Sequence, residues 1–144
     1  MTETQSSPPQ DCAGPESFLL DTSAILAFYH DEDGAETVER VFEQRERGEA
    51  VIWVSFMTLF EIKYLTLGGH VDSDLLLFRL STLDLDQVWP DDRIVQFAAE
   101  IKALGKISAA DAFIAASAMD RSATLVHGDK EFLRLSQKVR QLTI

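Results

Sequence analysis

The sequence predicts a single α/β domain in which helices cover both faces of a mostly parallel β-sheet. Short apolar segments alternate with amphipathic segments of helical length along nearly the whole chain, which is typical of βαβ units. Residues 51–54 are β-branched and apolar on both faces, as a buried parallel strand should be. A length of 144 residues, of which 46% are hydrophobic, suits one domain with its own core.

The first 16 residues differ from the rest, because they are rich in Ser, Pro and polar side chains and have little to bury. We expect a disordered tail over residues 1–16 and a folded domain over residues 17–144. The chain has no signal-peptide pattern and no apolar run near the roughly 20 residues of a membrane span, so we expect a cytoplasmic protein with no membrane contact. Cys12 is the only cysteine, which excludes an internal disulfide and a cysteine-based zinc site.

Apolar periodicity and turn residues predict the elements of the first half. A strand over 18–20 leads into a helix over 22–29, an acidic turn over 30–34, and a helix over 35–47 that ends at Gly48. A strand over 51–54 follows, and Ser55 then caps a helix over 56–67.

The second half continues the alternation. A helical stretch begins at Asp72, and a weak strand over 83–85 runs toward Val88. An amphipathic helix begins near Asp92 and is closed by Gly105. The remaining expected elements are a helix over 109–120, a strand over 124–127, a helical turn over 130–135 and a last strand over 139–142.

The net charge of −11, from 24 acidic and 13 basic residues, argues against nucleic-acid binding through a broad basic face. It does not exclude a nuclease, because metal ions can bridge clustered carboxylates to a phosphate.

Two aspartates follow predicted strands. Asp21 comes directly after the strand over 18–20, and Asp129 follows the strand over 124–127 by way of Gly128. In open α/β sheets, ligand sites lie outside the carboxyl ends of the strands. Aspartate also caps helix N-termini, so a purely structural role is open for both residues.

Glu61 lies on a helix that is apolar nearly all round and that we therefore expect to be largely buried. A carboxylate buried without a partner is costly, which favours a special site. The alternative is a Glu at the margin of the buried surface that reaches water or pairs with Lys63 or another cation.

Asp111 follows Ser108 by three positions, which is the spacing of a capping box. The functional alternative rests on Ala115 and Ala118, small residues on the same side of the helix that let other elements come close.

Two strand-end aspartates and two helical acids can converge on one edge of a parallel sheet. Four close carboxylates repel and raise one another's pKa values, and a divalent cation relieves that repulsion. Mg²⁺ and Mn²⁺ prefer oxygen ligands, and such a site suits phosphodiester hydrolysis.

The order of these acids resembles the PIN-domain family of metal-dependent ribonucleases. The matching pieces are Leu20-Asp21-Thr22-Ser23, Phe60-Glu61-Ile62, Asp111-Ala112-Phe113-Ile114-Ala115-Ala116-Ser117-Ala118 and Leu125-Val126-His127-Gly128-Asp129-Lys130-Glu131-Phe132. The resemblance extends from about Phe18 to the C-terminus and implies a three-layer α/β/α sandwich whose acidic pocket binds Mg²⁺ or Mn²⁺ and cleaves RNA.

Carried over by position, the resemblance makes catalytic metal ligands of Asp21, Glu61, Asp111 and Asp129. It also implies Thr22 or Ser23 as a supporting polar contact near the first acid. Family members often carry Thr or Ser where this chain has His127, which we interpret as a hydrogen-bonding or phosphate contact, or a mark of altered specificity, and not as a metal ligand.

Single-domain chains of this size resemble the VapC-type toxins of toxin–antitoxin pairs. That resemblance implies a cognate antitoxin whose Arg enters the acidic pocket. The apolar excess on the helix over 56–67 further suggests a homodimer or a partner surface. Two rivals stay open: a catalytically silent PIN-like module that binds proteins, and a metal-dependent phosphatase. Ser23 stands where an aspartyl-nucleophile DxD motif needs its second Asp, which argues against the phosphatase.

Overall fold

The computed structural model describes residues 13–70, 72–83 and 85–144. Its strands are β1 (Glu16–Leu20), β2 (Ala50–Ser55), β3 (Asp86–Val88), β4 (Thr124–His127) and β5 (Gln141–Thr143). Its helices are α1 (Thr22–His30), α2 (Ala35–Glu46), α3 (Phe56–Leu67), α4 (Ser73–Thr82), α5 (Asp92–Ala103), α6 (Ala109–Asp120) and the 3₁₀ helix η1 (Lys130–Leu135).

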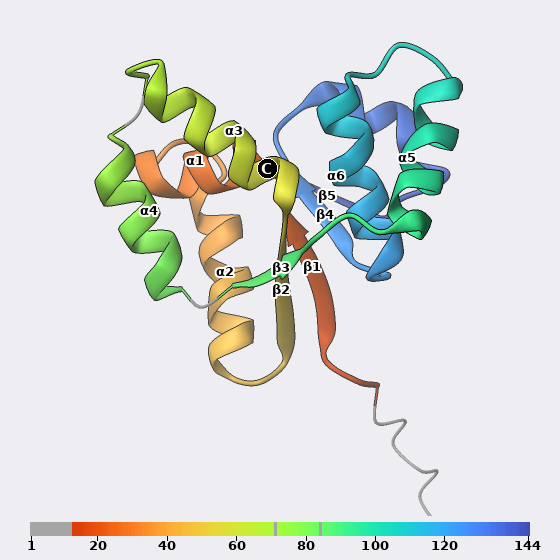
Figure 1. Cartoon of the computed structure of the whole chain (residues 1–144). Helices are drawn as coiled ribbons and strands as arrows, with labels where there is room; N and C mark the ends of the chain where they lie inside the picture. Colours follow the sequence, from red (N-terminus) through yellow and green to blue (C-terminus); the bar gives the residue numbers. More distant parts are fainter. Residues whose placement is uncertain (1–12, 71, 84) are drawn as a thin grey trace, which may run out of the picture.

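The strands form one five-stranded parallel sheet in the order β3-β2-β1-β4-β5. Helices α1 to α4 lie on one side of the sheet, and α5 and α6 lie on the other (Figure 1). This arrangement confirms the predicted α/β/α sandwich with its parallel central sheet.

Alternate residues of the central strand β1 enter two separate cores. Leu19 packs with Leu125 in the core under α5 and α6. Phe18 and Leu20 pack with Val126 in the core under α1, α2 and α3. The strand is therefore buried on both faces from Phe18 to Leu20, which explains why these three residues are all apolar.

Two predicted strands are shifted in the structure. The third strand begins at Asp86 rather than near Leu83, because α4 runs to Thr82 and Leu83 has helical backbone angles as its C-cap. Position 84, inside the predicted strand, lies outside the described residues. The last strand begins at Gln141 because Val139 is still in a turn, where its N–H donates to the Leu135 carbonyl.

The N-terminal boundary differs slightly from the prediction, since β1 already begins at Glu16. The rest of the predicted tail, over residues 1–12, lies outside the described residues. None of the described helices is long and apolar enough to cross a membrane.

The prediction that α3 is largely buried is wrong. Only Thr58 and Ile62 are buried on this helix, whereas Phe60 and Tyr64 are 58% and 65% exposed. The sheet and the neighbouring helices cover one side of α3, and no element in the described part of the chain covers its aromatic side. Apolar periodicity alone cannot distinguish a helix covered all round from one with an open apolar side.

Candidate functional site

The site lies beside two neighbouring strands, β1 and β4, from which the chain continues toward opposite edges of the sheet. From β1 the chain proceeds to β2 on one side, whereas β4, on the other side of β1, leads outward to β5. In parallel sheets a crevice opens at such a switch point, outside the carboxyl ends of the strands. Asp21 follows β1 directly, and Asp129 follows β4 by two residues.

A pocket of about 310 Å³ occupies this crevice. It brings together all four carboxylates predicted from the sequence and both predicted hydroxyl residues. The lining residues are Asp21, Thr22, Ser23, Leu26, Glu61, Tyr64, Leu65, Asp111 and Asp129. His127, the seventh predicted site residue, is not among them.

Asp21 is the most deeply placed acid, with 4% of its surface exposed. Its carboxylate caps α1 by accepting from the Ser23 N–H at 3.2 Å, and it also accepts from the Ser23 hydroxyl at 2.5 Å. The same hydroxyl accepts from the Gly128 N–H at 2.9 Å, so it ties Asp21 to the loop after β4. Burial raises the pKa of Asp21, while the hydrogen bonds from Ser23 and the charge of His127 partly oppose that rise.

Glu61 reaches the pocket from α3 and accepts a hydrogen bond from the Thr22 hydroxyl. Thr22 thus supports the second acid rather than the first. Burial raises the pKa of Glu61, and the nearby Asp21 and Asp129 carboxylates raise it further. No salt bridge joins Glu61 to Lys63 among the described residues, so the carboxylate lacks the cationic partner of the alternative interpretation.

Asp111 lies in the first turn of α6, where its N–H donates to the Ser108 Oγ at 3.0 Å. Burial raises the pKa of Asp111 to about 7. A hydrogen bond with Glu131 and the charges of Asp21 and Asp129 add to the rise, against the opposing hydrogen bond with Ser108. Asp111 therefore ionises near neutral pH instead of near 3.8.

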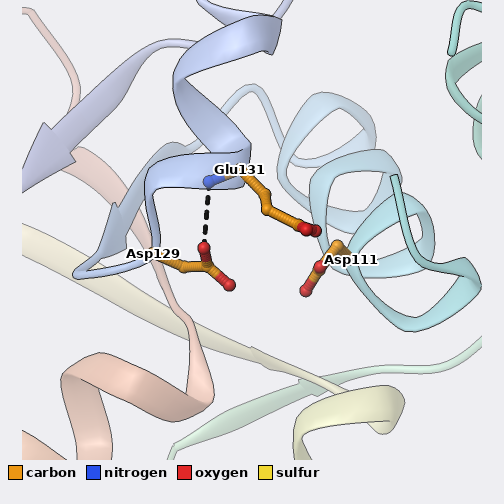
Figure 2. A group of neighbouring side chains, drawn as sticks. All are labelled: Asp111, Asp129 and Glu131. Carbon is orange, nitrogen blue, oxygen red and sulfur yellow. Dashed lines mark hydrogen bonds between the residues drawn. The ribbon is translucent and has the colours of Figure 1, made fainter. Parts of the chain in front are cut away.

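Glu131 is a fifth carboxylate that sequence reasoning did not assign to the site. One carboxylate oxygen each from Asp111, Asp129 and Glu131 lie within 4.8 Å of one another. Figure 2 shows the Glu131 side chain extending from η1 toward Asp111 on α6, while the Asp129 carboxylate accepts from the Glu131 N–H at 2.9 Å. The available signal was the Asp129-Lys130-Glu131 spacing, because a carboxylate two residues after a capping Asp lies in the first turn beside it.

His127 lies inside the protein, fully buried, and does not reach the pocket. Its Nε2 is 2.9 Å from the Gln141 Oε1, and its ring centroid is 5.0 Å from that of Phe132. The Gln141 Nε2 donates to the Phe132 carbonyl at 2.6 Å, which orients the amide so that its oxygen accepts from His127. The Nδ1 atom of His127 has no hydrogen-bond partner in the described structure.

The oxygen-rich donor set fits a hard divalent cation. Four carboxylates line the pocket, and a fifth, from Glu131, lies close to those of Asp111 and Asp129. No Lys, Arg or His lines the described pocket, and burial holds the pKa values of three acids above their usual range. A cation would relieve both the repulsion and the cost of burying charge. The chemistry of these ligands matches Mg²⁺ or Mn²⁺, which take oxygen donors, and not a soft metal.

Comparison with known proteins establishes the fold and the family of the chain. No curated protein sequence matches the chain. Among solved structures, the chain is similar to one in VapBC2 from Rickettsia felis bound to a promoter DNA fragment, with a TM-score of 0.68 and 18% identity over 88% of this chain and 98% of that one. It is also similar to a chain of VapBC-1 from nontypeable Haemophilus influenzae, with a TM-score of 0.62 and 17% identity over 88% and 97% of the two chains.

A third similar structure is VapBC-5 from Mycobacterium tuberculosis, a member of the VapBC family of toxin–antitoxin systems. Its TM-score is 0.60, with 22% identity over 90% of this chain and 98% of that chain. At these identities the structures establish the fold. The family itself follows from the sequence, because the PIN domain family model matches residues 18–138. The chain belongs to the PIN domain family.

Proposed function

We propose that this PIN-domain chain is a Mg²⁺- or Mn²⁺-dependent endoribonuclease and the toxin of a type II toxin–antitoxin pair. The supporting observation is the convergence of Asp21, Glu61, Asp111 and Asp129 on one pocket at the switch point of the sheet. These four acids are the metal ligands and catalytic residues of the proposal. Glu131 joins them as a further carboxylate.

The residues of this chain hold the carboxylates in place before any ligand arrives. Ser23 orients Asp21 and links it to Gly128, while the Thr22 hydroxyl orients Glu61. Such hydroxyl contacts fix the direction of a metal-binding carboxylate. His127 lies behind the pocket, where its buried ring contacts Gln141 of β5 and Phe132 of η1.

The chemistry follows from this arrangement. A divalent cation bound there supplies a water of lowered pKa and stabilises the negative charge that grows on a phosphate. Without it, the acidic pocket repels the RNA backbone. Burial and the neighbouring carboxylates raise the pKa of Asp111 to about 7, so loss of its proton near neutral pH completes the anionic ligand set.

Cleavage of short single-stranded RNA by the purified protein, with MgCl₂, with MnCl₂ and with EDTA, tests the proposal. We expect cleavage only with a divalent cation and a loss of at least about 100-fold in kcat/KM for Asp21→Asn. The Asn side chain keeps the oxygen that caps α1, so the fold should survive. Asp31→Asn is the matched control, because Asp31 is exposed, lies outside the pocket, and has a left-handed conformation that Asn tolerates. Equal cleavage by wild type and Asp21→Asn would contradict the proposal.

The toxin assignment is supported by the similarity to chains from VapBC complexes. We expect a cognate antitoxin, an RNA target and a cytoplasmic location, where both would be met. Expression of the chain alone in a bacterial host should slow growth, and Glu61→Gln should relieve the inhibition at unchanged protein level. Inhibition by both proteins to the same extent would exclude RNA cleavage as its cause.

An apolar groove supports a protein partner or a homodimer. A cavity of about 520 Å³ lies beside α3 and α4, and Phe60 and Trp89 in its lining are 58% and 62% exposed. Patches of this kind usually mark interaction surfaces. Light scattering of the isolated protein, and co-expression with the product of a neighbouring reading frame, distinguish a homodimer from an antitoxin contact.

The same groove favours the second candidate function, a catalytically silent PIN-like module. Metal titration separates the two, because a ligand bound only to the native state raises its melting temperature. At about 100 times the Kd, the expected stabilisation is about 2.7 kcal/mol, or roughly 5–15 °C for a domain of this size. A silent module with no metal site would show no such shift.

A further inference from the structure

The pocket has an apolar wall as well as its carboxylates. Leu26, Tyr64 and Leu65 line one part of it. Tyr64 follows Glu61 by three residues on α3, so its side chain lies on the same helix face, one turn from a proposed metal ligand. A cation site needs no such wall, because Mg²⁺ and Mn²⁺ are held by oxygen atoms.

Tyr64 is not part of the core. Its side chain is 65% exposed, and its hydroxyl makes no hydrogen bond within the described part of the chain. Its nearest aromatic neighbour is Phe60, one turn earlier, whose ring is 6.4 Å away between centroids and inclined by 18°. A flat ring with an open face is therefore held beside the carboxylates.

Charge indicates what this ring can bind. The chain has a net charge of −11, and no cationic side chain lines the described pocket. A polyanionic substrate can gain little affinity here from contacts between Lys or Arg and phosphate. Stacking of a base on an aromatic ring does not depend on charge, and it is the other main source of affinity for single-stranded nucleic acid.

We propose that Tyr64 is a substrate-binding residue on which one base of a single-stranded RNA stacks, next to the phosphate that is cleaved. The inference rests on the proposed ribonuclease function and names the side chain that holds one base of its substrate. A duplex would not serve, since its bases are stacked on one another and are not free to cover a protein ring.

The test uses a single-stranded RNA oligonucleotide that the wild-type protein cleaves at one mapped bond in MgCl₂ or MnCl₂. We expect Tyr64→Ala to raise KM by about 5- to 150-fold, the range for the loss of one stacked base. Tyr64→Phe keeps the ring and should stay near wild type, whereas Tyr64→Leu keeps an apolar side chain without the ring and should resemble Tyr64→Ala. Phe78→Ala is the matched control, because Phe78 is also 65% exposed but lies on α4, outside the pocket.

Substrates with one abasic nucleotide on either side of the cleaved bond identify the stacked base. At one position the abasic substitution should raise KM for the wild type but add little to the effect of Tyr64→Ala, because both changes remove the same contact. Independent, additive effects at every position would overturn the proposal, as would an unchanged KM for Tyr64→Ala.

Two further outcomes are distinct. If Tyr64→Ala leaves KM unchanged but converts a dimer into a monomer in light scattering, this face of α3 binds protein and the stacking proposal is wrong. If the wild type cleaves no RNA with either cation, the proposed function fails and the stacking proposal fails with it. Cleavage by the wild type with an unaffected Tyr64→Ala would remove only the stacking proposal.

Discussion

At the scale of single residues, one carboxylate can both cap a helix and line the pocket. Asp21 and Asp129 each cap a helix with one carboxylate oxygen and line the pocket as well. The Ser108 hydroxyl caps α6 at Asp111, whose carboxylate lines the same pocket. A helix that begins at the carboxyl end of a strand needs an oxygen atom at the place where a ligand site forms, so one carboxylate serves both purposes.

The raised pKa values predict an unusual pH dependence for the metal-free protein. When the pKa of an acid is higher in the folded protein than in the unfolded chain, the free energy of unfolding falls as the pH rises between these two pKa values. For Asp111 this loss should extend from its ordinary pKa near 3.8 to about 7 in the folded protein. Asp111→Asn cannot ionise, so its melting temperature in EDTA should rise relative to that of the wild type over this window.

Thermal unfolding of both proteins between pH 4 and pH 8 measures the difference. Glu131→Gln is a second variant, because removing this carboxylate should lower the pKa of Asp111 in the folded protein and so lower the upper limit of the window. Addition of MgCl₂ at pH 8 should raise the melting temperature of the wild type more than that of Asp111→Asn, since only the wild type has the complete ligand set. A difference in melting temperature that is constant with pH would show that Asp111 ionises normally.

At the scale of elements, the start of α6 holds a residue that caps the helix, Ser108, and a residue that lines the pocket, Asp111. Ser108→Ala removes the cap and should cost about 0.5–2 kcal/mol of stability. It also removes a hydrogen bond that lowers the pKa of Asp111, so cleavage near neutral pH should fall and should recover as the pH is raised. Asp111→Asn leaves the Ser108 cap in place and should abolish cleavage without loss of structure. Circular dichroism with cleavage assays checks both, and loss of helix in Asp111→Asn would instead support a structural role.

Two glycines that flank α2, Gly34 before it and Gly48 after it, allow a second prediction at this scale. Gly34 and Gly48 both have positive φ, of 92° and 72°, so alanine at either position should cost about 1–2 kcal/mol. At Gly34 an added Cβ would also lie 2.6 Å from the Ile144 Cβ, whereas nothing lies within 4 Å at Gly48. We therefore expect Gly34→Ala to be destabilising by about 1–3 kcal/mol more than Gly48→Ala.

Urea unfolding of the two variants gives this difference. In the Ile144→Gly background, Gly34→Ala should cost no more than Gly48→Ala, because the contact partner is gone. Equal destabilisation at the two glycines would mean that the C-terminal residue does not pack against the turn as described.

At the scale of the whole molecule, the net charge of −11 predicts how cleavage responds to salt. A protein that contacts six to ten phosphates through Lys and Arg loses about 10³- to 10⁵-fold in affinity between 50 and 200 mM salt. With no cation lining the described pocket, we expect kcat/KM to fall by less than about tenfold over this range. Cleavage assays in KCl at a fixed MgCl₂ concentration check this, and a steep loss would reveal basic contacts outside the pocket.

The sequence by itself determined the order of the elements and the identity of four pocket acids. Buried parallel strands leave an uninterrupted apolar pattern, as in β1 and β2, and capping residues mark where α3 and α6 begin. The boundaries of β3 and β5 were less well predicted, because both are only three residues long and give too short a pattern.

Only the tertiary structure decided which side chains meet. Glu131 approaches Asp111 because η1 packs beside α6, a contact between segments about twenty positions apart that no local pattern encodes. His127 is turned into the protein by Gln141, away from the pocket that its sequence position suggested. Tyr64 is open and not buried because no described element covers that side of α3. Local sequence fixes backbone conformation and face, whereas the neighbours of a side chain depend on the packing of elements distant along the chain.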